Sequence, residues 1–155
     1  MSDALDALRR LEGDWAGNGE GEFPTIDSFA YRETFHFYCN GIEPMLHFEQ
    51  RTWRQPNDEP LHWESGFLRL DDSGEIEMVN SQNGERVEVM RGQLQWDAES
   101  LNLELNSTLL GNDPRLTATR RRYTLSGPTL SYRIWMATTR CPELTHHLEA
   151  SLQRV

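Results

Sequence analysis

The stretch GDWAGNGEGEFPTI (residues 13–26) decides the fold of this chain. Its alternate positions carry four glycines and one tryptophan: Gly13, Trp15, Gly17, Gly19 and Gly21. A period of two belongs to a β-strand, in which residues i and i+2 share one face. One face of this strand is therefore bare backbone apart from one indole. Glycine weakens a strand unless another group approaches closely or the strand bends at a barrel corner. The stretch predicts the first, sharply bent strand of a small β-barrel.

Most of the remaining chain alternates apolar and polar residues between turn signals, as in LNLEL (101–105). This alternation is typical of an antiparallel sheet. A helix is predicted only at the N-terminus, where Gly13 should end it. Its apolar residues share one face: Ala4, Leu5, Leu8 and Leu11. The pattern therefore predicts an all-β fold, a ten-stranded antiparallel up-and-down β-barrel with a short N-terminal helix. Because side chains alone cannot fill a barrel of this size, we expect a ligand cavity inside it.

Length and composition limit the class of protein. The 155 residues are predicted to form one domain, 1–155, and the net charge of −10 argues against nucleic acid or an anionic membrane as a partner. No apolar stretch reaches the length of a membrane span or resembles a signal peptide. Cys39 and Cys141 have no metal-ligand spacing, so we expect reduced thiols in a cytoplasmic protein. We interpret the run Arg120–Arg122 as a strand with alternating solvated arginines.

The chain resembles the nitrobindins, small haem-binding barrels related in shape to lipocalins and fatty-acid-binding proteins. Their opening signature, GxWxGxGxGx[YF]PTI, matches residues 13–26, with Phe23 in place of the usual tyrosine. Further similar segments follow in order: FAYRETFHF (29–37), GIEPMLHFEQRTW (41–53), PLHWESGFLR (60–69), TATRRRYTL (117–125), LSYRIWMAT (130–138) and HLEASLQRV (147–155). The resemblance implies one haem b per chain, isomerisation of peroxynitrite to nitrate at the ferric haem, and reversible binding of nitric oxide. It leaves a homodimer open.

The resemblance also implies an axial ligand for the haem iron. In nitrobindins this ligand is the histidine of an HLxAxL motif, which matches His147 because Leu148 and Ala150 follow it at the right offsets. Histidine suits the role, because one ring nitrogen binds iron while the other needs an acceptor that fixes the tautomer. His146 is the neighbouring alternative. Strand alternation places the His147 side chain on the other face of the strand from Leu148 and Ala150. Either a bulge intervenes, or those apolar residues pack under the helix.

Four further residues match positions that contact haem or line its pocket in the family. Thr25 corresponds to a threonine that contacts haem, or else it caps the bend after the proline. Leu61 and His62 match the pocket on the other face of the iron, and Met136 matches another pocket residue. The segment TTRCPELTH (138–146) carries one more residue than the family pattern, so Met136 lies one residue further from His147 than is usual.

A haem-free binding protein is the alternative function. Barrels of this shape hold fatty acids or other apolar carboxylates, with arginine and tyrosine inside to bind the head group. The candidates for that role are Arg69, Arg122, Tyr132 and Arg133. No hydrolase motif such as GxSxG or HExxH occurs, so we expect no catalytic residue beyond a haem iron.

Overall fold

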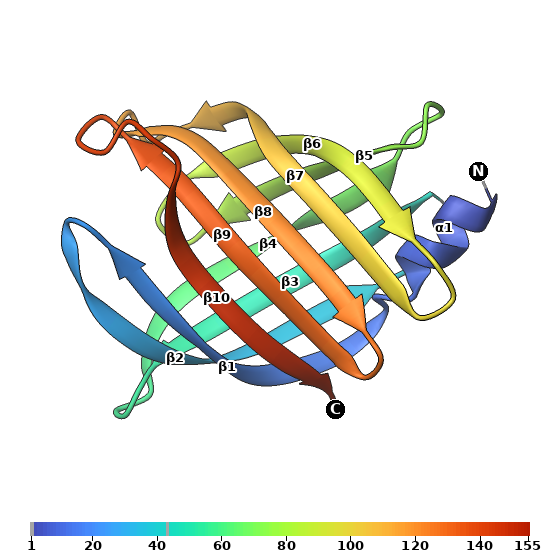
Figure 1. The fold of residues 1–155 in the computed structure, drawn as a ribbon, viewed down its shortest axis with the longest axis horizontal. Coiled ribbons are helices and arrows are strands. Elements are labelled where there is room, and N and C mark those ends of the chain that lie inside the picture. The colour runs from blue at the N-terminus through green and yellow to red at the C-terminus, as the bar shows by residue number, and fades with distance from the viewer. Residues whose placement is uncertain (1, 43) are drawn as a thin grey trace.

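The computed structural model describes residues 2–42 and 44–155, which form a closed barrel of ten antiparallel strands. A helix and the strands follow one another along the chain: α1 (Ser2–Arg9), β1 (Gly13–Phe23), β2 (Ile26–Tyr38), β3 (Met45–Arg54), β4 (Glu59–Leu70), β5 (Glu75–Gln82), β6 (Val87–Trp96), β7 (Ser100–Gly111), β8 (Leu116–Ser126), β9 (Thr129–Thr138) and β10 (Thr145–Arg154). Each strand pairs with its neighbours in sequence, and β1 pairs with β10 to close the sheet (Figure 1). The predicted fold class is confirmed.

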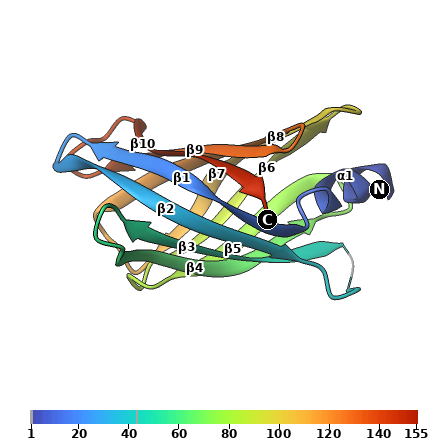
Figure 2. The same cartoon turned by 90° about the horizontal axis from the view of Figure 1, so that it is seen from below.

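The helix α1 lies at one end of the barrel, and both views place it there (Figures 1 and 2). Leu5, Leu8 and Leu11 are buried in the core, as predicted. The prediction that Gly13 ends this helix is wrong. The helix ends at Arg9, three i to i−3 backbone hydrogen bonds continue the chain to Glu12, and Gly13 opens β1 with a φ of 127°. That positive φ explains why glycine stands there.

The glycine face of β1 makes room for aromatic rings of β2. Gly19 lies opposite Tyr31 and Gly21 lies opposite Phe29 in the antiparallel register. A Cβ atom added to either glycine would overlap the ring of its partner. The rings therefore lie over bare backbone, which is the close approach that the alternating glycines predict.

The barrel interior has two layers. The layer near α1 is apolar, with large buried side chains from many strands, such as Phe48, Leu68 and Leu101. The layer beyond it holds buried polar and charged side chains: Glu33, Gln50, Thr52, Glu64, Asn80, Glu88, Thr119 and Arg121. Burying charged groups is unfavourable unless they are paired, so this layer indicates a function or a specific network.

Cys39 and Cys141 are free thiols. Within the described part of the chain, no helix is long and apolar enough to cross a membrane.

Candidate functional site

A cavity of about 340 Å³ lies inside the barrel at the end away from α1. The turns β1–β2, β3–β4, β5–β6, β7–β8 and β9–β10 surround this end (Figure 1). Four of the residues predicted for the haem site line the cavity: Leu61, His62, Met136 and His147. Thr25 does not line it, because this residue lies exposed in the β1–β2 turn. The structure therefore brings together four of the five side chains.

A β-bulge turns His147 into the cavity. The register between β10 and β9 shifts between His146 and Leu148, so His147 is the extra residue of β10. A bulge re-aims one side chain without reversing the strand, and it places both His147 and Leu148 on the cavity wall. Of the two explanations for the conflict in strand alternation, the bulge is the correct one.

The His147 ring is oriented by the backbone of the neighbouring strand. Its Nδ1–H donates a hydrogen bond of 2.9 Å to the carbonyl oxygen of Glu22, in β1. The Phe23 ring packs edge-on against it, with centroids 5.7 Å apart. Because Nδ1 carries the proton, Nε2 has the free lone pair that binds a metal. Burial lowers the pKa of His147, although the Glu22 carbonyl opposes this shift, so the ring is neutral at neutral pH.

His146 points to the outer face of the barrel. Its Nδ1 lies 3.0 Å from a carboxylate oxygen of Glu22, and its ring packs against Trp135. His146 is absent from the lining of the cavity. Of the two adjacent histidines, only His147 can reach a ligand in the barrel.

The residues around the cavity fit a haem group. The volume lies within the range of ligand sites, roughly 300–1,000 Å³, and His147 is a neutral imidazole with one oriented and one free nitrogen. Apolar side chains from four strands line the wall: Phe29, Leu61, Ile134, Met136 and Leu148. Arg86 and Arg115 also line the cavity, and guanidinium groups suit the carboxylates of a porphyrin. Both arginines contact Asp113, and the Arg86 hydrogen bond lowers the pKa of that carboxyl to about 2.

The floor of the cavity is an ion-pair network that the sequence analysis missed. Arg121 Nη2 lies 3.1 Å from Glu64 Oε2 and 3.0 Å from Glu88 Oε1. His62 Nε2 lies 3.2 Å from the same Glu64 oxygen. Burial acts to raise the pKa of Glu64, but the Arg121 charge and the His62 hydrogen bond outweigh it and hold that pKa well below its ordinary value. Glu64 therefore fixes the His62 ring at the cavity wall.

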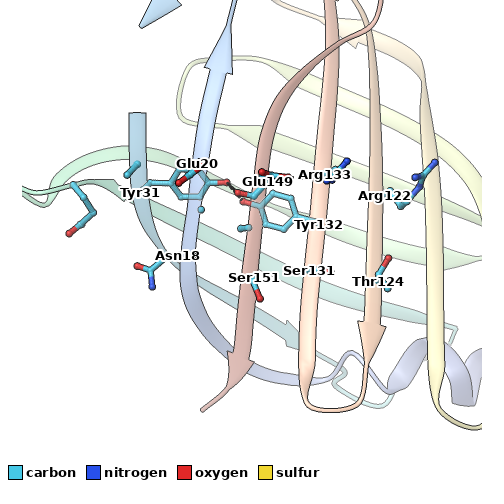
Figure 3. A pocket seen from close by; sticks show the side chains of 14 residues that line it. Asn18, Glu20, Tyr31, Arg122, Thr124, Ser131, Tyr132, Arg133, Glu149 and Ser151 are labelled. Carbon is cyan, nitrogen blue, oxygen red and sulfur yellow. Dashed lines mark hydrogen bonds and ion pairs between the residues drawn. The ribbon is translucent and has the colours of Figure 1, made fainter. Parts of the chain in front are cut away.

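The arginines proposed for a fatty-acid head group are not in the interior, which corrects that part of the sequence analysis. Arg69, Arg122 and Arg133 are exposed, and only Tyr132 of that set is buried. Arg122 and Arg133 instead border a hollow of about 700 Å³ on the outer face of β8, β9, β10 and β1 (Figure 3). There Arg133 pairs with Glu149 at 3.3 Å, and the neighbouring Arg122 pairs with Glu104 at 2.7 Å. The arginines of the run alternate as predicted, because Arg120 and Arg122 are solvated and Arg121 between them points inward.

Comparison with known proteins agrees with this geometry. The model of the THAP4-like, heme-binding beta-barrel domain matches residues 4–154. The chain belongs to this haem-binding family. A peroxynitrite isomerase of Arabidopsis thaliana is 39% identical over 148 residues, which are 96% of this chain and 87% of the relative. Peroxynitrite isomerase 1 of Rhodococcus jostii (strain RHA1) is also 39% identical, over 96% of this chain and 82% of the relative.

Among solved structures, the crystal structure of Rv2717c from M. tuberculosis superposes with a TM-score of 0.91. It is 34% identical and covers 98% of this chain and 97% of its own. The resemblance to nitrobindins is thus confirmed, and haem is the cofactor of this family of barrels.

Proposed function

We propose that this member of the haem-binding barrel family isomerises peroxynitrite to nitrate at a ferric haem b held by His147, and that the same haem binds nitric oxide reversibly. One observation carries the proposal: His147 is a neutral imidazole on a cavity wall, with Nδ1–H bound to the Glu22 carbonyl and Nε2 free. The names of the relatives, which are peroxynitrite isomerases over most of this chain, support the choice of substrate.

The reaction rearranges the atoms of peroxynitrite and consumes no net proton or electron. A bound ferric haem supplies a Lewis acid for the peroxynitrite oxygen, so the protein needs no acid–base pair. The tasks left to the side chains are to hold the iron and to exclude water. His147 serves the first task, and Leu61, Met136 and Leu148 serve the second because they cover the cavity wall with apolar surface.

His62 has a narrower role in this scheme. Its ring is held by Glu64 at 3.2 Å and faces the cavity, where it could hydrogen-bond an oxygen atom of the substrate. Such a bond modulates the reaction, and no step depends on it.

The haem-free carrier of a fatty acid is the poorer explanation of this interior. In the described part of the barrel, the buried arginine of the floor, Arg121, already binds the carboxylates of Glu64 and Glu88. At the floor of the cavity, a carboxylate head group would meet two glutamates for one guanidinium. The like charges of the glutamates disfavour a carboxylate there.

Reconstitution of the purified chain with haem tests the proposal. We expect a ferric Soret band, and stopped-flow mixing should show faster peroxynitrite decay with nitrate as the product. His147→Ala should lose the band and most haem affinity, while His146→Ala, the matched control on the outer face, should keep both. Equal effects of the two substitutions would reject His147 as the ligand. A fully loaded wild-type protein that leaves peroxynitrite decay unchanged would reject the isomerase activity.

A further inference from the structure

Glu33 is a fully buried carboxyl group that the haem site does not use. It lies on the inner face of β2, at 0% exposure. Its Oε2 accepts hydrogen bonds from Gln50 Nε2 and, at 2.8 Å, from the hydroxyl of Tyr132. Its Oε1 is buried and has no hydrogen-bond partner among the described residues. Oε2 thus accepts two hydrogen bonds, and Oε1 has no hydrogen-bond partner among the described residues.

Among the described residues, no positively charged side chain forms an ion pair with Glu33, and Arg121 lowers its pKa only weakly compared with burial. The interior guanidinium, Arg121, is bound to Glu64 and Glu88, and the other groups near Glu33 are phenols or amides. The titratable groups that act on Glu33 or contact it from the surrounding strands are Tyr31, Glu64, Arg121, Tyr123 and Tyr132. An isolated buried carboxylate is very unfavourable, so the group stays neutral instead. Burial raises the pKa of Glu33 to about 8, against the opposing hydrogen bonds of Gln50 and Tyr132.

The position of the proton follows from the hydrogen bonds. Oε2 accepts from two donors, so its lone pairs are occupied, and the proton of a neutral carboxyl belongs on Oε1. An Oε1–H group without an acceptor would be a buried unsatisfied donor. Such groups in native proteins are nearly always satisfied by protein or by an ordered molecule.

Thr52 provides the second half of a site. It is the direct cross-strand neighbour of Glu33, in β3, and its hydroxyl is also buried without a partner. Side chains directly opposite in an antiparallel pair have Cβ atoms about 4.5–5.5 Å apart, so the two side chains are immediate neighbours on the inner face of the sheet. Thr52 lines the cavity, and its neighbour on the other side is His62. Thr52 therefore borders the ligand cavity, whereas Glu33 is not among the residues that line it.

We propose that Glu33 is protonated in the folded protein and that its Oε1–H and the Thr52 hydroxyl form an internal site for one small neutral hydroxylic molecule, which is water in the resting protein. The site needs both an acceptor for Oε1–H and a partner for Thr52, and a water molecule serves as both. An anion is disfavoured at this site, because none of the described side chains that hydrogen-bond Glu33 or Thr52 is positively charged. This site is separate from His147 and does not depend on the isomerase activity.

Infrared spectroscopy of the full chain, with and without haem, tests the proposal. The carbonyl stretch of a protonated carboxyl group should appear at pH 7 in the difference between wild type and Glu33→Gln. It should disappear as the pH is raised above about 8, since the proton then leaves Glu33. Glu33→Gln keeps a neutral side chain of the same shape, and Glu20→Gln, at an exposed position of β1, is the control that should show no such band at pH 7.

Thr52 variants test the bound molecule. Thr52→Val removes the hydroxyl at nearly constant shape, so the Glu33 band should shift to higher wavenumber, and Thr52→Ser should leave it in place. A crystal structure of the wild type should show water between Glu33 Oε1 and Thr52 Oγ1. The absence of a protonated carboxyl band at pH 7 would overturn the proposal. A band that does not respond to Thr52→Val would overturn the shared site.

Discussion

Replacing Arg121 by methionine should destabilise the barrel strongly, because two buried carboxylates, Glu64 and Glu88, lose their guanidinium partner. In the wild type, Arg121 is 3% exposed and Glu64 is 1% exposed, and they form two hydrogen bonds with each other. Arg121 also binds Glu88, which is buried as well. Methionine has a similar length and no charge, so packing is largely kept while the charge is lost.

The expected magnitude follows from this burial. Removing one partner of a buried ion pair costs about 3–5 kcal/mol, since the other charge remains uncompensated. In a domain of this size, 1 kcal/mol lowers the melting temperature by roughly 2–4 °C. We therefore expect Arg121→Met to melt about 6–20 °C below the wild type at pH 7. Arg122→Met is the matched control, because its ion pair with Glu104 is half exposed and contributes less than about 1 kcal/mol.

The effect should also depend on pH, with a sign set by Glu64. Its pKa in the folded wild type is lowered, so its ion pair contributes stability above the ordinary pKa of 4.5 and loses it as the pH falls through the folded value. Without Arg121 this pKa rises, and protonation removes the unpaired charge. The difference between wild type and Arg121→Met should therefore shrink from pH 7 toward pH 4.

Urea denaturation of the haem-free chain, followed by circular dichroism at pH 7 and pH 4, measures both effects. A loss below about 1 kcal/mol at pH 7 would refute the reasoning, because it would mean that solvent already stabilises the carboxylates. The same loss at both pH values would refute the assignment of the effect to Glu64.

Two further predictions concern the barrel wall and the cavity. Gly17→Ala should lower the melting temperature by several degrees, because the new Cβ would overlap the carbonyl oxygen of Ser151 in β10. Gly84→Ala, which has open space around it, is the control and should change the melting temperature little. Calorimetry measures both, and an unchanged melting temperature for Gly17→Ala would contradict the close approach. His62→Leu should retain haem and lower peroxynitrite decay only modestly in stopped-flow measurements, while a loss of about a hundredfold at matched haem content would make His62 an essential acid–base group.

The glycine face of β1 was predictable because its signal is local. Alternation within GDWAGNGEGEF specifies a strand and an empty face without any knowledge of its neighbours. The same face then determines what lies beside it, since Tyr31 and Phe29 of the next strand cover Gly19 and Gly21. Thr25 lies exposed in the β1–β2 turn and is not among the residues that line the cavity, so its contact with haem stays a prediction.

The polar layer was not predicted, although part of its signal is in the sequence. Alternation with Tyr31 and Phe35 places Glu33 on the inner face of its strand, so a buried carboxyl could have been inferred. Its partners could not, because Gln50 and Tyr132 lie 17 and 99 residues further along the chain. Which inward polar residues meet depends on barrel closure and register, and neither is encoded in a short segment.

The position of the His147 side chain also depends on strand pairing. The segment 138–146 just before it carries one residue more than the family pattern. The loop after β9 closes on itself, since the Thr138 N–H donates to the Cys141 carbonyl at 2.8 Å, and Met136 pairs with Thr145. The register then holds until the bulge at His147. Without that bulge, alternation along β10 would place this ring on the outer face, as it does for Glu149. In the bulged conformation the Glu22 carbonyl accepts the Nδ1–H bond of His147, so the hydrogen bond that selects the tautomer also stabilises the bulge that brings the ring to the cavity.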